Sequence, residues 1–102
     1  MKIITFFLFC LVNFSVYANE VGEWFNKATT EYSSNNYKQA VAWYRKAAKQ
    51  GHADAQYNLG VMYDEGDGIP QDNKQAVVWY RKAADQGHAA AQFNLVLILV
   101  FM

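Results

Sequence analysis

The chain has 102 residues, of which nine are basic and nine acidic, so its formal net charge is zero. This length allows at most one small domain, and the balanced charge gives no indication of nucleic acid or an anionic membrane surface as a partner. The one cysteine, Cys10, lies in an apolar segment near the N-terminus, so the rest of the chain forms no disulfide and offers no thiol nucleophile.

The first 18 residues have the pattern of a secretory signal peptide. Lys2 precedes an apolar run at residues 3–12, and small or apolar residues at 16–18 stand where a signal peptidase cleaves. The run is shorter than the about 20 residues that a membrane-spanning helix needs. We expect cleavage after Ala18, so that an exported protein, periplasmic or secreted, begins at Asn19. An uncleaved N-terminal anchor is the alternative.

A first helix is expected at about residues 20–33 of the exported chain. Trp24, Ala28 and Tyr32 are each four residues apart, so they share one face of a helix. The polar sequence Ser-Ser-Asn-Asn at residues 33–36 then predicts a turn.

Internal repetition is the strongest signal in the rest of the chain. The segment KQAVAWYRKAAKQGHADAQYNL (residues 38–59) recurs as KQAVVWYRKAADQGHAAAQFNL (residues 74–95), with a period of 36 and 18 of 22 positions identical. A period of about 20–50 residues indicates stacked supersecondary units that share one core.

Each unit is predicted to contain two helices, and the four helices are expected at about residues 37–50, 53–65, 73–86 and 89–101. The first has one apolar face at helical spacing, formed by Ala40, Val41, Tyr44, Ala47 and Ala48.

Start and stop signals bound these helices. Asn36 and Asp72 are each followed three residues later by a glutamine, the spacing of a capping-box variant. Gly51 and Gly87 stand where a left-handed residue ends a helix. The sequence GDGIPQDN, residues 66–73, is predicted to be a loop because it contains glycine and proline.

Residues 55–89, AQYNLGVMYDEGDGIPQDNKQAVVWYRKAADQGHA, resemble the Sel1-like repeat family, relatives of tetratricopeptide repeats with a longer loop between helices. Leu59-Gly60-x-x-Tyr63 and Ala76-x-x-x-Tyr80 match two tetratricopeptide signatures, while the period and the Gly-x-Gly of the loop favour the Sel1-like branch.

The resemblance implies an all-α fold, a right-handed α-solenoid of antiparallel helix pairs with about five helices after the signal peptide. We expect a tetratricopeptide-like helix pair at residues 19–50 and a Sel1-like repeat at residues 51–86. Residues 87–102 form an incomplete repeat with an apolar C-terminal helix.

The same resemblance implies a non-enzymatic protein whose concave face binds a protein or peptide. Asparagines recur at positions 26, 58 and 94, and in tetratricopeptide repeats such asparagines can bind a peptide backbone. If the leading helices line the groove, an exposed apolar and aromatic patch with polar neighbours is the chemistry that a peptide site needs. The candidate contacts are Asp54, Tyr57, Asn58, Val61 and Asp64.

Two other functions stay open at this point. A cysteine-rich branch of the family is linked to β-lactam or peptidoglycan-like ligands, but the exported chain has no cysteine. A truncated repeat fragment without function is the other possibility. No catalytic constellation is present, because Ser33 and Ser34 have no histidine near in sequence and no G-x-S-x-G occurs. We therefore expect no enzyme and no cofactor.

Other conspicuous residues have simpler explanations than a site. His52 and His88 stand at equivalent positions of the two copies. Packed helices lie about 10 Å apart, which is too far for two such side chains to bind one metal ion. We therefore expect no metal site there and interpret both histidines as turn residues at helix starts. The acidic residues of the loop lack the EF-hand pattern. Trp43 and Trp79 lie at the edge of the apolar stripe, which favours packing over a ligand platform.

The final residues break the repeat. Residues 95–102 are all apolar, whereas the preceding copy becomes two-faced after Leu59 and carries acidic residues. A frameshift truncation after Leu95, an interface with a partner or second copy, and membrane contact are the three explanations, and the abrupt change favours the first. The interface explanation predicts self-association through a set of apolar residues: Val96, Leu99, Val100 and Phe101.

Overall fold

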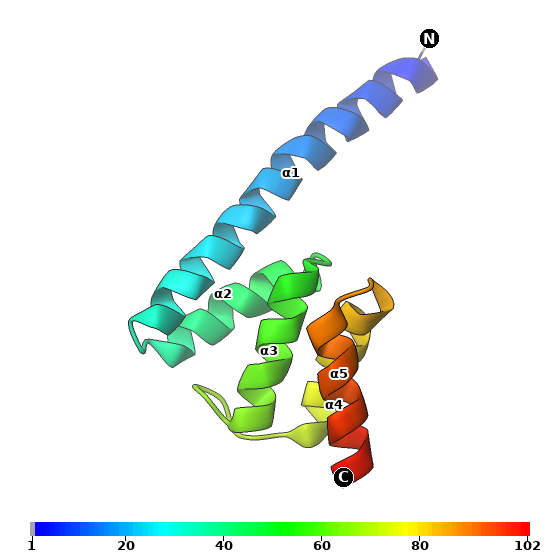
Figure 1. The fold of residues 1–102 in the computed structure, drawn as a ribbon. Coiled ribbons are helices and arrows are strands. Elements are labelled where there is room, and N and C mark those ends of the chain that lie inside the picture. The colour runs from blue at the N-terminus through cyan, green and yellow to red at the C-terminus, as the bar shows by residue number, and fades with distance from the viewer. Residues whose placement is uncertain (1) are drawn as a thin grey trace.

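The computed structural model describes the backbone of residues 2–102 and the side chains of residues 18–102. Over this part of the chain it contains five helices, which are α1 (Lys2–Ser33), α2 (Tyr37–Lys49), α3 (Ala53–Glu65), α4 (Asn73–Asp85) and α5 (Ala89–Phe101). Consecutive helices run in alternating directions and each packs on the next (Figure 1). The predicted all-α solenoid of antiparallel helix pairs is confirmed.

The helix bounds agree closely with the expected ones, except that α1 begins at Lys2 and not at about residue 20. Helices α2 to α5 begin at the predicted residues and end within one residue of the predicted ends, and α1 ends at Ser33. The predicted signal peptide, residues 1–18, lies outside the residues whose side chains are described, apart from Ala18, and stays a prediction. Within the described residues, no helix has the length and apolar character needed to cross a membrane.

One of the two predicted side-chain caps forms and the other does not. The Asp72 carboxylate accepts hydrogen bonds from the backbone N–H groups of Lys74 and Gln75, at 3.0 and 3.2 Å, and so caps α4. Asn36 makes no such bond. Its carboxamide donates instead to the Glu31 carboxylate at 2.9 Å, because the short turn after α1 brings these two side chains together. The prediction of a side-chain cap at Asn36 was therefore wrong.

The helices α2 and α4 end in the same way, as their sequences predict. Gly51 and Gly87 have φ values of 91° and 88°, in the left-handed region that a Cβ disfavours. The N–H of Gly51 donates to the Ala48 carbonyl at 3.0 Å, and the N–H of His52 donates to the Ala47 carbonyl at 3.3 Å. This is a Schellman motif, and it turns the chain directly into the next helix.

Small residues dominate the contacts between helices. The alanine side chain is a single methyl group, so buried alanines let helix backbones approach closely. The close approach favours dispersion contacts along the whole crossing. The alanines with at most 1% exposure are Ala28, Ala40, Ala47, Ala48, Ala55, Ala76, Ala83 and Ala91. The tyrosines of the apolar stripe, Tyr44 and Tyr80, are buried among them, while the neighbouring tryptophans are only partly buried. Both pairs therefore pack as the stripe predicts.

A close crossing joins α3 to α4 at Gly60. A Cβ built on Gly60 would lie 2.7 and 2.8 Å from two ring carbons of Tyr80, so the aromatic ring occupies the space that any other residue would need. Tyr80 has no exposed surface, and its hydroxyl donates to the Asp64 carboxylate at 3.2 Å. Gly60 and Tyr80 together fix how the two helices of the repeat cross.

The loop between α3 and α4 also depends on a glycine. Gly68 has a φ of 70°, and a Cβ there would lie 2.5 Å from the backbone carbonyl carbon of Tyr37. The loop therefore rests directly on the first turn of α2, which ties the second repeat to the first.

We predict that Gly60→Ala destabilises the protein by about 1–3 kcal/mol, the usual cost of an overpacked core, because Tyr80 must move. Urea unfolding followed by circular dichroism measures this change. Gly22→Ala is the matched control, since Gly22 lies in α1 with no neighbouring atom within 4 Å of a Cβ. It should instead stabilise the helix by about 0.5–1 kcal/mol. Equal effects of the two changes would contradict the close crossing.

The buried hydroxyl of Tyr80 predicts a loss of stability at high pH. Burial, and then the nearby Asp64 carboxylate, raise the pKa of Tyr80 above its ordinary value of 10.0. The unfolded chain therefore releases this proton first, so the stabilising effect is complete below pH of about 10 and is lost as pH rises above it. In urea unfolding from neutral to alkaline pH, Tyr80→Phe should flatten this decline. An unchanged decline would contradict the assignment.

Candidate functional site

A hollow of about 260 Å³ lies between α1 and α3, with α2 behind it. Tyr32 of α1 and Tyr44 of α2 contribute phenol side chains, and the remainder of the wall comes from two consecutive turns of α3. The α3 side chains that line it are Tyr57, Asn58, Val61 and Met62. The hollow thus combines aromatic and aliphatic walls with a few polar atoms, the usual composition of a ligand site.

The polar atoms of the hollow differ in what they already bind. The Tyr44 hydroxyl is hydrogen-bonded to the Thr29 hydroxyl at 3.2 Å, and the Tyr57 hydroxyl accepts from the Asn94 carboxamide at 3.4 Å. Within the described part of the chain, no residue is hydrogen-bonded to the carboxamide of Asn58. Asn58 therefore offers both a donor and an acceptor to a ligand.

Three of the five predicted contact residues lie together, and the other two lie apart from them and from each other. Tyr57, Asn58 and Val61 line the hollow together. Asp54 lies in the first turn of α3, where its carboxylate contacts His88. Asp64 binds the Tyr80 hydroxyl and lines a separate hollow beside α5. Spacings of three and four residues place all five on one side of α3, but Asp54 and Asp64 lie about one turn beyond the hollow at either end, beside different neighbours.

Two wall residues, Tyr32 and Tyr44, were not among the predicted contacts. Sequence spacing placed both on apolar helix faces, and Tyr44 is indeed buried. Only the angles between α1, α2 and α3 decide that part of each ring also borders the hollow. The available signal in the sequence was that both residues are aromatic and recur at helical spacing. This signal does not show whether an aromatic ring is packed in the core or borders a hollow.

One end of the hollow is negatively charged. Burial and then the carboxylates of Asp67 and Glu65 raise the pKa of Tyr32. Burial also raises the pKa of Glu65, together with a hydrogen bond to Asp67 and repulsion from the Asp67 and Asp64 carboxylates. Besides burial, the two shifts share one cause, a local excess of carboxylates beside the Tyr32 end of the hollow. A cation placed there would reduce the repulsion.

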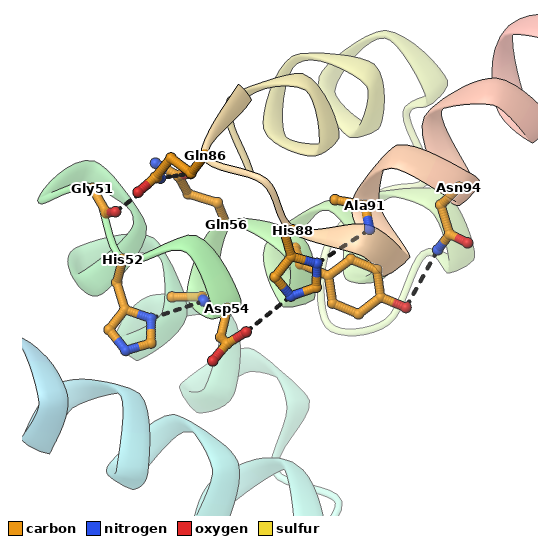
Figure 2. A network of polar contacts seen from close by, with 10 residues as sticks. Gly51, His52, Asp54, Gln56, Gln86, His88, Ala91 and Asn94 are labelled. Carbon is orange, nitrogen blue, oxygen red and sulfur yellow. Dashed lines mark hydrogen bonds and ion pairs between the residues drawn. The ribbon is translucent and has the colours of Figure 1, made fainter. Parts of the chain in front are cut away.

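The opposite end is held by a polar network that joins the turn after α4 to the turn after α2 and to the first turn of α3 (Figure 2). The Gln86 carboxamide donates to the Gly51 carbonyl at 3.0 Å and to the Gln56 side-chain oxygen at 2.8 Å. The His88 imidazole contacts the Asp54 carboxylate at 2.9 Å. The ring of His88 stacks on Tyr57, with centroids 4.7 Å apart. These contacts fix the position of Tyr57 at the hollow.

The two histidines cap helices, as their interpretation at helix starts predicts. Nδ1 of His52 accepts from the N–H of Ala55 at 3.1 Å, and Nδ1 of His88 accepts from the N–H of Ala91 at 3.2 Å. The His52 ring also stacks on Phe25 of α1, and the His88 ring stacks on Tyr57 of α3. Across the described residues, no group of three or more metal-ligating side chains forms.

Comparisons with known proteins agree with this architecture. The family model described as Sel1 repeat matches residues 19–52 and 53–88. A search of curated proteins finds no match.

The solved structures that are similar to this chain include the following two. One is a protective antigen present in uropathogenic Escherichia coli strains that displays an SLR fold, with a TM-score of 0.71, 38% identity, and coverage of 79% of this chain and 18% of that one. The other is a Sel1 repeat protein from Oxalobacter formigenes, with a TM-score of 0.56, 52% identity, and coverage of 57% of this chain and 24% of that one. The chain thus spans only a minor part of either relative.

Proposed function

This chain belongs to the Sel1 repeat family, and we propose on this basis that it is a non-enzymatic protein that binds a peptide segment of a partner protein in the hollow between α1 and α3. Sel1 repeats generally mediate protein–protein interaction, and their fold is typically a scaffold without catalytic activity. The observation that carries the proposal is the Asn58 carboxamide. It borders an aromatic-lined hollow, and no described residue is hydrogen-bonded to it.

The chemistry of the hollow favours an extended peptide as the ligand. A carboxamide can donate to a backbone carbonyl and accept from a backbone N–H at the same time, so Asn58 recognises main chain rather than a particular side chain. Val61 offers apolar contact to a neighbouring side chain of the peptide.

The charge of the surroundings indicates which peptides bind best. Glu65 and Asp67 lie at one end of the hollow, and Asp54 lies at the other end with its carboxylate largely exposed. Asp64 adds negative charge beside Glu65. We therefore propose that the preferred peptides carry lysine or arginine flanking an apolar residue, since complementary charge raises both specificity and association rate.

We predict that a random peptide library displayed on phage and selected on the wild-type chain becomes enriched in such basic and apolar sequences. Asn58→Ala should weaken binding of the selected peptides by about tenfold, corresponding to about 1.4 kcal/mol, because two main-chain hydrogen bonds are lost. Gln75→Ala is the control, since Gln75 is exposed on α4 and does not line the hollow. Equal binding by Asn58→Ala and wild type would exclude this hollow as the site.

We also propose that the protein acts outside the cytoplasm. The proposal rests on the charged, apolar and small-residue regions of residues 1–18. Mass spectrometry of the protein recovered from the periplasm or medium of an expressing bacterium should show an N-terminus at Asn19. Recovery of the unprocessed chain in the cell membrane would instead support an anchor.

A further inference from the structure

The helix α5 carries a continuous apolar face that no other described element covers. Phe93, Val96, Val100 and Phe101 are 64%, 61%, 68% and 83% exposed. Their spacing of three and four residues places them on one side of the helix, together with Leu97. The opposite side, with Ala91 and Ile98, is buried against the rest of the protein. No residue of α5 is charged.

The register of the repeat shows that a further Sel1 helix cannot cover this face in the usual way. Val96 is the counterpart of Gly60 at the period of 36 residues. Tyr80 of α4 packs so closely on Gly60 that a Cβ there would lie 2.7 Å from its ring. A helix docked on α5 as α4 docks on α3 would therefore drive its tyrosine ring into the side chain of Val96.

We propose that this face binds the same face of a second copy of the chain, forming a symmetric dimer through α5. Two identical apolar helix faces are complementary to each other, as an isologous contact requires. Because no residue of α5 is charged, the two helices bring no like charges of their own together. Valine side chains from the two copies can pack against each other without a glycine at the contact, whereas the crossing of α3 and α4 depends on Gly60.

The exposed area is consistent with such a dimer. A phenylalanine side chain offers about 150–250 Å² for burial, so Phe93 and Phe101 alone expose roughly 300 Å² in each copy. With the aliphatic side chains of the face, a dimer would bury on the order of 1,200 Å² in total, at the lower end of the range for specific interfaces. A reversible, concentration-dependent dimer is therefore expected.

The borders of the face also have the character of an interface. A hollow of about 260 Å³ runs beside α5, and Leu97 and Phe101 form its apolar wall. Its other side is polar, with Asp64, Asn73 and Asn94. An apolar centre with a polar rim is the usual arrangement of protein interfaces.

Sedimentation of the full chain over a range of concentrations tests the proposal. Wild type should pass from monomer to dimer. Val100→Glu should raise the midpoint concentration by more than about tenfold, because pairing would bury an unpaired charge. Val78→Glu is the matched control, since Val78 is an exposed valine on α4, and it should leave the midpoint unchanged. Circular dichroism verifies that both variants keep their helices.

A second measurement locates the contact. In a Cys10→Ser background, Leu97→Cys should form a disulfide-linked dimer on mild oxidation, whereas Gln75→Cys on α4 should not. A wild-type chain that stays monomeric at every concentration would overturn the proposal and leave the face to a different partner or a lipid surface. Association that Val100→Glu does not weaken, or that proceeds beyond the dimer, would overturn it as well.

Discussion

The aromatic ring of Tyr80 lies against the backbone of Gly60, and this contact sets the geometry on which the second repeat depends. The ring fills the space of an absent side chain, so α3 and α4 cross more closely than larger residues would permit. With the helices at this distance, the Tyr80 hydroxyl reaches the Asp64 carboxylate, and the ring lies 5.9 Å from that of Tyr57. The crossing therefore also positions Tyr57, which forms part of the wall of the hollow.

The connections between helices extend this geometry along the solenoid. A glycine in the left-handed conformation ends α2, and His52, the residue after it, caps α3. The same two-residue device joins α4 to α5 through Gly87 and His88. His88 and Gln86 then reach back to the first copy of this turn. In an array where each unit contacts only its neighbours, such links between equivalent turns keep successive units in register.

Helices α3 and α5 show how two copies of one sequence acquire different surfaces. Both begin with a histidine cap and carry an asparagine at equivalent positions, Asn58 and Asn94. In α3 the asparagine side chain is left to face the hollow, whereas Asn94 is used to hold the hydroxyl of Tyr57. After the shared leucine, Gly60 accepts an aromatic ring, and its counterpart Val96 presents an apolar surface. The proposed peptide contact and the proposed dimer contact follow from these two divergences.

The sequence alone determined the helices, their order and most of their ends, because these depend on local chemistry. The glycines at positions 51 and 87 and the carboxylate of Asp72 act within a few residues of their own position, and the period of 36 residues can be read directly from the sequence. Tertiary structure decided the rest. Asp54 contacts His88, 34 residues later in the chain, and Tyr32 and Tyr44 both border the hollow. These outcomes depend on distances between helices, which follow from how side chains of different helices fill shared space, and no local pattern specifies that.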